Sequence, residues 1–159
     1  MERFSKILFN NNISDDDVKK AANDIGILEF IESLPGGFNY NVKERGVMLS
    51  EGQRQLVSFL RAYVSNPKIL ILDEATSSID SRTEQLIQYA TNKIIKGKTS
   101  IIIAHRLSTI LNADKILFLE GGEVKEFGSH EELIKIENGL YKKLFEYQFQ
   151  DSELVEQIV

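Results

Sequence analysis

The sequence predicts an α/β fold in which a small helical lobe precedes a core of parallel strands. Residues 69–72 and 100–104 are short apolar runs, with the length and composition of strands that are buried on both faces. A helical pattern over residues 81–95 separates them, and a strand–helix–strand unit of this kind forms a right-handed crossover between parallel strands. Before Pro67 the apolar residues recur at helical spacing instead, which predicts the helical lobe.

Composition limits the classes of function that are open to the chain. Its 159 residues suit one domain, and 42% apolar residues is ordinary for a soluble protein. The net charge of −5, without a long basic block, disfavours sequence-independent nucleic-acid binding. The sequence has no cysteine and two histidines, which excludes disulfides, thiolate chemistry and a multi-histidine metal site. No run is long enough to span a membrane, so we expect a soluble chain without direct membrane insertion.

The helical lobe is expected to cover residues 14–66, after a connecting segment at residues 1–13. Ser14 has the character of an N-cap, because three aspartates follow it where the helix dipole favours acids. A second short helix around residues 28–34 ends at Pro35-Gly36-Gly37. The third helix of the lobe begins at Ser50 and ends at Asn66-Pro67.

The start of that third helix is a candidate anion site. Ser50 and Gln53 have capping-box spacing, and free backbone N–H groups at a helix N-terminus attract anions. Gly52 would let a phosphate approach the backbone closely. The plain alternative is a capped helix start without a ligand.

Two carboxylates, Asp73 and Glu74, stand where the strand at 69–72 should end. Ligands of open parallel sheets bind beyond the carboxyl ends of the strands. One carboxylate can hold a hard cation such as Mg²⁺, and the other can orient or deprotonate an attacking water. An acidic loop after a core strand is the alternative. Asp80 ends the turn that follows.

The remaining elements follow in order. Ser81 and Glu84 have capping-box spacing at the start of the helix over residues 81–95, which Gly97 ends. A short helix is expected over 106–112, a strand over 116–119, a hairpin turn at Gly121-Gly122 and a return strand over 123–127. Ser129 should cap a further helix, residues 139–149 should be helical, and residues 151–159 should fray.

Three other polar patterns have both a functional and a structural interpretation. His105 follows the strand at 100–104, at the same sheet edge as Asp73 and Glu74, where it can hydrogen-bond a terminal phosphate. Gly97-Lys98-Thr99 looks like the end of a P-loop, but residue 92 is asparagine and the segment follows a helix and opens a strand. We therefore reject a P-loop there, and we interpret His130 as part of a helix start.

Taken in order, LSEGQ, ILILDEATSSID and IIIAHRLST resemble the ATP-binding-cassette (ABC) ATPases, most closely the nucleotide-binding domain of an exporter. The resemblance runs from about Ile7 to about Phe149. It implies a partial P-loop NTPase (RecA-like) core with parallel strands. Residues 14–66 would be the helical signature subdomain, and residues 67–150 the C-terminal half of the core.

The resemblance also implies a role for each motif residue. Asp73 would coordinate Mg²⁺ through water, Glu74 would be the general base, and His105 would lie near the γ-phosphate. The signature motif, which in this family caps the ATP of the opposite subunit, would contribute Ser50, Gly52 and Gln53. The D-loop, which couples the two sites of a dimer, would contribute Ser77, Ser78 and Asp80. The turn Glu44-Arg45-Gly46 resembles the loop that contacts the membrane domains of exporters.

Two features depart from the family pattern. Glu51 stands where the family usually has glycine, and we expect it to be tolerated because Gly52 keeps the backbone donor. The sequence also contains no P-loop, no glutamine loop and no aromatic residue placed to stack on adenine. Since the P-loop supplies most of the contacts that bind the ATP phosphates, we expect the isolated chain to bind ATP weakly and to hydrolyse it negligibly.

The resemblance thus implies an ATP- and Mg²⁺-dependent module of an exporter. It would work with a second nucleotide-binding domain and with transmembrane domains, at the cytoplasmic side of the plasma (inner) membrane. The alternative is a non-catalytic interaction module that donates its signature helix and D-loop to a partner's ATP site. A chromosome-maintenance ATPase is disfavoured, because residues 14–48 hold only short helices where that class has a long coiled coil. The sequence does not indicate the transported substrate.

Overall fold

The computed structural model describes residues 13–40, 48–73, 79–104 and 107–156. Contacts divide the chain into two compact units, residues 1–103 (unit 1) and 104–159 (unit 2). This division reflects which residues contact one another. It does not test the expected boundary between residues 66 and 67, which separates two subdomains of the family and stays a prediction.

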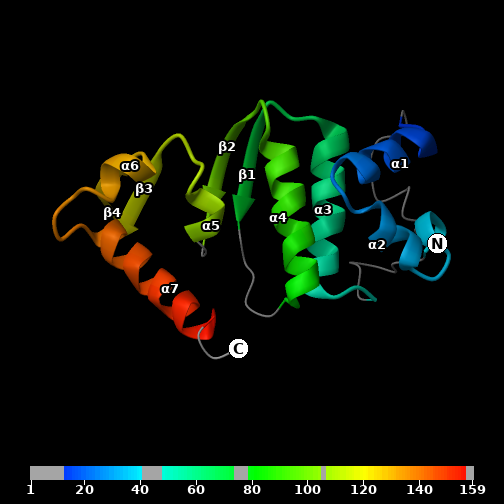
Figure 1. The fold of residues 1–159 in the computed structure, drawn as a ribbon. Coiled ribbons are helices and arrows are strands. Elements are labelled where there is room, and N and C mark those ends of the chain that lie inside the picture. Colours follow the sequence, from blue (N-terminus) through cyan, green and yellow to red (C-terminus); the bar gives the residue numbers. More distant parts are fainter. Residues whose placement is uncertain (1–12, 41–47, 74–78, 105–106, 157–159) are drawn as a thin grey trace. The chain divides into compact units, whose positions relative to one another are not determined.

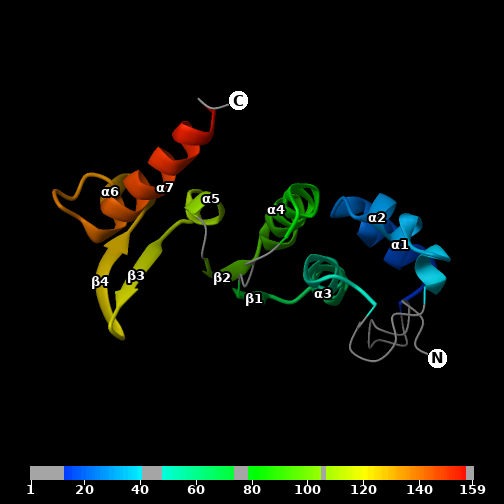
Figure 2. The ribbon, with the colours of Figure 1, turned by 90° about the horizontal axis from the view of Figure 1, so that it is seen from below.

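Unit 1 contains four α-helices, one 3₁₀ helix and two strands within the described residues (Figures 1 and 2). The helical lobe forms as predicted. It consists of α1 (Asp15–Asp24), α2 (Leu28–Ser33), the 3₁₀ helix η2 (Gly37–Asn39) and α3 (Glu51–Ser65). Ser14 caps α1 by accepting a hydrogen bond from the N–H of Asp17, as its position in the sequence predicts. Gly26 joins α1 to α2 at φ +77°, and a Cβ there would lie 2.6 Å from the Tyr89 ring.

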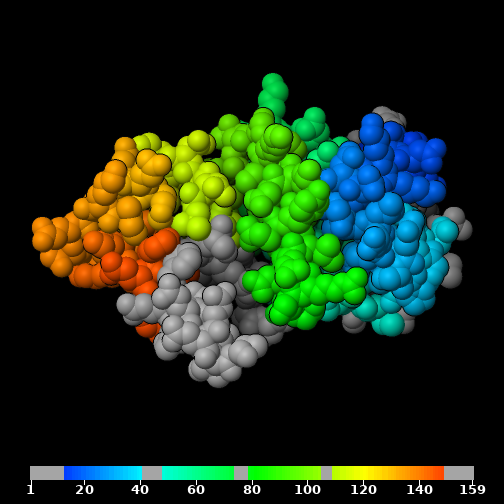
Figure 3. Space-filling view, viewed as in Figure 1, coloured from blue at the N-terminus to red at the C-terminus, as the bar shows by residue number. Residues whose placement is uncertain are grey.

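The parallel strand pair is also confirmed. Strand β1 (Ile69–Asp73) pairs with β2 (Thr99–Ile103), and α4 (Ser81–Ile95) makes the crossover between them. Helices α3 and α4 pack side by side, and in Figure 3 α4 meets α1 and α2 on the surface of unit 1. One core holds these elements together, and its fully buried members include Ala22, Ile25, Ile31, Leu56, Leu60 and Ile94.

The prediction that both strands are buried on both faces is wrong for this chain. Leu70 is buried on the face that the core covers. On the opposite face Ile69, Ile71, Ile101 and Ile103 are each more than half exposed, at 62%, 67%, 55% and 52%. Side chains alternate between the faces of a strand, and none of the described residues covers this second face. We call these four isoleucines the bare face of the sheet.

The N-cap of α4 also differs from the prediction. Ser81 is the first residue of the helix, and Asp80 is the N-cap, accepting a hydrogen bond from the N–H of Thr83 at 3.0 Å. Aspartate caps a helix as well as serine does, so the sequence alone does not show whether Asp80 or Ser81 is the N-cap. The backbone conformation decides it. Asp80 has the extended backbone that a cap requires.

Unit 2 is built around an antiparallel hairpin. Strand β3 (Ile116–Glu120) pairs with β4 (Glu123–Gly128) across the predicted Gly121-Gly122 turn. The short helix α5 (Leu107–Ile110) precedes the hairpin, and α6 (His130–Leu133) and α7 (Leu140–Glu156) follow it. Ser129 caps α6 with Glu132 in a capping box, as predicted.

Packing in unit 2 centres on Tyr141, which is fully buried beside Ile116 and Leu133. Its hydroxyl lies 2.8 Å from Nδ1 of His130. The carboxylate of Glu126 accepts hydrogen bonds from the backbone N–H groups of Leu140 and Tyr141, which fixes the start of α7 on β4. His130 is therefore a packed residue at a helix start, as its sequence context predicted. Among the described residues, none of the helices combines the length and apolar character that crossing a membrane requires.

Acid should destabilise the fold through its helix caps. Hydrogen bonds from Ser14 lower the pKa of Asp17, the N–H of Thr83 lowers that of Asp80, and the N–H of Ser129 with Lys115 lowers that of Glu132. A lowered folded-state pKa contributes stability above the unfolded-state value, which for aspartate is about 3.9, and this stability is lost as the pH falls through the folded-state pKa. We expect the melting temperature, followed by circular dichroism, to fall below about pH 4. Asp80→Asn keeps the cap without the titration, so an unchanged acid response in that variant would contradict the contribution of Asp80.

Candidate functional site

The N-terminus of α3 presents the predicted capping box. The backbone N–H of Gln53 donates to Ser50 Oγ at 3.3 Å, and the backbone N–H of Ser50 donates to Gln53 Oε1 at 3.0 Å. Ser50 and Glu51 are exposed and Gln53 is partly exposed. The capping box satisfies the N–H of Gln53, and the first-turn amides of Glu51 and Gly52 are not hydrogen-bonded within the helix, as in any first turn.

Gly52 has a packing role that the sequence did not reveal. It is buried, and a Cβ built on it would lie 2.6 Å from Thr83 Cγ2 and 3.1 Å from Ile79 Cγ2. Thr83 lies in the first turn of α4, and Ile79 lies just before that helix. Only a residue without a side chain lets α3 and α4 approach this closely, so the glycine is explained by helix packing as well as by the phosphate approach that the sequence suggested.

Arg54 stabilises the turn before α3 through a side-chain hydrogen bond. Its Nη1 donates to the backbone carbonyl of Leu49 at 2.8 Å, and Leu49 is 5% exposed. The next residue, Ser50, is thereby held at the helix start. Sequence reasoning missed Arg54 and Thr83, and the only available signal was their position, directly after the LSEGQ motif and three residues after Asp80.

The carboxyl end of β1 and the start of α3 line one cavity in unit 1. Its volume is about 470 Å³, and its polar lining includes Glu51, Arg54 and Asp73. Asp73 is the last residue of β1 and is exposed. The structure therefore brings two of the predicted motifs, the LSEGQ helix and the strand that ends in aspartate, to a single concave surface.

Asp80 connects the turn after β1 with the LSEGQ helix. Its carboxylate accepts from the Thr83 amide, which lowers its pKa, and the methyl group of Thr83 lies over Gly52. Asp80 and Gly52 are thus connected through Thr83 in the first turn of α4.

Several predicted site residues lie outside the described residues. They are Glu74, Ser77, Ser78 and His105, together with the turn Glu44-Arg45-Gly46. Their roles remain predictions from the sequence.

Comparisons with known proteins bear on these motifs. The family model described as ABC transporter matches residues 2–77. The mouse protein named ATP-binding cassette sub-family B member 10, mitochondrial, is 46% identical over 87% of this chain and 19% of its own length. The ATP-dependent lipid A-core flippase of Methylobacillus flagellatus is 45% identical over 92% of this chain and 26% of its own length.

A solved structure agrees with the sequence comparisons. The structure titled as a bacterial Atm1-family ABC exporter with ATP bound matches at a TM-score of 0.77 and 40% identity, covering 92% of this chain and 26% of the other. The chain belongs to the ABC transporter family. It spans about a quarter or less of the length of the ABC relatives described above.

Membership of the ABC family confirms the resemblance and the P-loop NTPase fold that the three motifs indicated. ABC proteins bind ATP, generally with Mg²⁺. The described part of the candidate site offers one carboxylate at a strand end, Asp73, and a second in the lining of the same cavity, Glu51. This suits Mg²⁺, which is usually held by one or two carboxylates together with substrate phosphates and water.

Proposed function

We propose that this chain forms part of the ATP-binding and ATP-hydrolysing module of an ABC exporter, in which hydrolysis drives transport across a membrane. The observation that carries the proposal is the cavity shared by the start of α3 and the end of β1, with Glu51, Arg54 and Asp73 in its lining. The LSEGQ helix belongs to the helical lobe and β1 to the parallel strand pair, so two motifs of an ABC ATPase lie close together within unit 1.

Each motif residue has a chemical task in this proposal. Asp73 would hold Mg²⁺ through water, and Mg²⁺ bound there would supply positive charge next to the ATP phosphates. Glu74 accepts a proton from the attacking water, and His105 donates a hydrogen bond to the γ-phosphate. The amides at the start of α3 and the Ser50 hydroxyl bind the phosphates of an ATP molecule held by the opposite subunit, which suits the positive end of a helix dipole.

The bare face of the sheet supports a further part of this proposal, which concerns the place where a P-loop-bearing segment binds this chain. Parallel sheets are almost always covered on both faces, and the four isoleucines of the bare face are each more than half exposed here. We propose that polypeptide carrying the P-loop covers them. An ATP site then forms between its phosphate-binding loop and the carboxyl ends of β1 and β2.

The test is complementation with a P-loop-bearing segment. The chain alone should show negligible ATP hydrolysis, and hydrolysis should appear when it is mixed with the N-terminal segment of an ABC exporter domain that contains the P-loop. Ile71→Asp places a charge on the bare face and should prevent both association and hydrolysis, because burying an unpaired charge is costly.

Ile136→Asp provides the matched control, because Ile136 is also exposed, at 41%, but belongs to unit 2 and to no part of the bare face. Association of the Ile71→Asp variant at the strength of the control would contradict the proposed docking. Strong hydrolysis by the chain alone would overturn the expectation that a separate P-loop is needed.

The partners of the module follow from the same proposal. They are a second nucleotide-binding domain, in a homodimer or heterodimer, and transmembrane domains that keep the module at the cytoplasmic side of the membrane.

The interaction-module alternative keeps one supporting observation, the preformed capping box of Ser50 and Gln53. A chain with that role would activate a partner's ATP site while its own Glu74 could be replaced without effect.

A further inference from the structure

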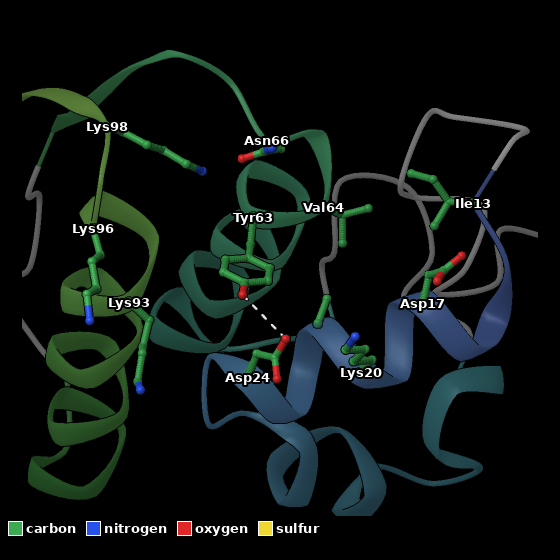
Figure 4. A pocket seen from close by; sticks show the side chains of 11 residues that line it. Ile13, Asp17, Lys20, Asp24, Tyr63, Val64, Asn66, Lys93, Lys96 and Lys98 are labelled. Atoms are coloured by element: carbon green, nitrogen blue, oxygen red, sulfur yellow. Dashed lines mark hydrogen bonds between the residues drawn. The ribbon is translucent and has the colours of Figure 1, made fainter.

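A second cavity of unit 1, distinct from the one at the motifs, is lined by lysines. Its volume is about 620 Å³, within the range of small-molecule pockets. Lys20 comes from α1, Lys93 from α4, and Lys96 and Lys98 from the connection between α4 and β2. Figure 4 shows Tyr63 of α3 between α1 and α4, with lysines on both sides of it. We call these four lysines and Tyr63 the lysine pocket.

The charges of the lysine pocket are poorly balanced within the described residues. None of its four lysines forms an ion pair with a carboxylate that the structure describes, whereas Lys115 and Lys125 in unit 2 do. Its lining contains two acids, Asp17 and Asp24, which leaves an excess of two positive charges, 4 − 2. This excess is unusual in a chain whose net charge is −5.

Both acids already have partners. The carboxylate of Asp17 accepts hydrogen bonds from the backbone and hydroxyl of Ser14 in the cap of α1. Asp24 accepts from the hydroxyl of Tyr63 at 3.4 Å, and burial together with Asp24 raises the pKa of that tyrosine, so it stays protonated as the donor. Lys93 and Lys98 lie over the rings of Tyr89 and Tyr63, at 5.2 Å and 5.9 Å from the ring centroids, and such contacts do not use the hydrogen-bond donors of the ammonium groups. The lysines are therefore the groups that remain available to a ligand.

Capping of α4 does not account for the lysines. A helix C-terminus carries about half a negative charge, which one lysine near the end compensates. Lys93 lies in the last turn of α4 and serves that purpose. Lys96 and Lys98 lie beyond the last helical residue, and Lys20 belongs to a different helix.

The lysine pocket lies at the opposite end of the strands from the candidate ATP site. Lys98 immediately precedes β2 and Asn66 precedes β1, whereas Asp73 ends β1. Four residue steps along a strand span roughly 13 Å. A ligand in the pocket would thus leave the carboxyl ends of the strands free.

We propose that the lysine pocket binds a phosphate-bearing anion at a site separate from the ATP site. The ligand would bridge α1 to the connection between α4 and β2, and would stabilise unit 1 by binding only its folded form. A soluble phosphorylated molecule and a phospholipid headgroup share this chemistry.

Calorimetric titration with inorganic pyrophosphate tests the soluble source, and sedimentation with phosphatidylglycerol vesicles tests the lipid source. The triple variant Lys93→Gln, Lys96→Gln and Lys98→Gln should bind about tenfold or more weakly, since each lost charge pair contributes up to about 1 kcal/mol. The control variant Lys19→Gln, Lys135→Gln and Lys143→Gln removes the same charge from exposed positions outside the pocket and should bind as the parent does.

The outcomes separate the alternatives. Pyrophosphate binding that only the pocket variant loses supports a soluble ligand, and vesicle binding alone with the same loss supports a headgroup. Equal binding by the two triple variants, or no binding to either probe, overturns the proposal. Circular dichroism establishes that each variant is folded, and Lys20→Gln, which changes only α1, gives a second test if the triple variant is not.

Discussion

Gly52→Ala is expected to destabilise unit 1, although alanine is the better helix former. In an open helical position this change would stabilise the fold by about 0.8–1 kcal/mol. Here the new Cβ would lie 2.6 Å from Thr83 Cγ2, and overpacking of this kind costs about 1–3 kcal/mol. Chemical denaturation followed by circular dichroism should therefore show a lower free energy of unfolding for the variant.

Thr83→Ser supplies the matched test, because it removes the methyl group that the new Cβ would meet and keeps the residue whose amide Asp80 caps. The double variant should recover part of the lost stability, the remaining cost coming from Ile79 at 3.1 Å. A stabilised Gly52→Ala variant would show that α3 and α4 do not pack this closely. Recovery would also confirm that residues 52 and 83 are in contact.

Glu74→Gln is expected to reduce ATP turnover of the complemented site by about 10²–10⁴, the usual contribution of a general base. The amide keeps the size of the side chain and cannot accept the proton from water. Binding of ATP should change little, because the proposed phosphate contacts come from other residues. Turnover and nucleotide affinity, measured on the same complex, separate the two effects.

Glu131→Gln is the control for this prediction, since it makes the same substitution at an exposed position of α6 in unit 2. Equal turnover by the two variants would remove Glu74 from the mechanism. It would then favour the interaction-module alternative, in which the chain's own acids are not used.

The secondary structure was partly predictable because the starts of α1, α3 and α6 each carry a local signal. Ser14, Ser50 and Ser129 are each followed three residues later by a side chain that completes a capping box. These interactions span three residues and need no tertiary contact, so the sequence shows them directly. At α4 two adjacent candidates competed, and the backbone conformation selected Asp80 over Ser81.

The positions of the candidate site residues along the chain were predictable from the order of the motifs. Asp73 at the end of a strand and Ser50 at the start of a helix follow from local pattern, and the crossover around α4 places the carboxyl ends of β1 and β2 at one edge. The cavity that Glu51, Arg54 and Asp73 share depends on how α3 lies against β1, which no local pattern encodes.

By itself, the sequence determined the helical lobe, the parallel strand pair and the ABC motifs, because these depend on periodicity, caps and short-range spacing. Only the tertiary structure decided that Gly52 packs against Thr83, that one sheet face is bare, and that Lys20 joins three lysines from beyond residue 90. These features arise where segments distant in the sequence come within van der Waals or electrostatic range. That proximity is set by the packing of whole helices against the sheet and not by the residues of any one segment.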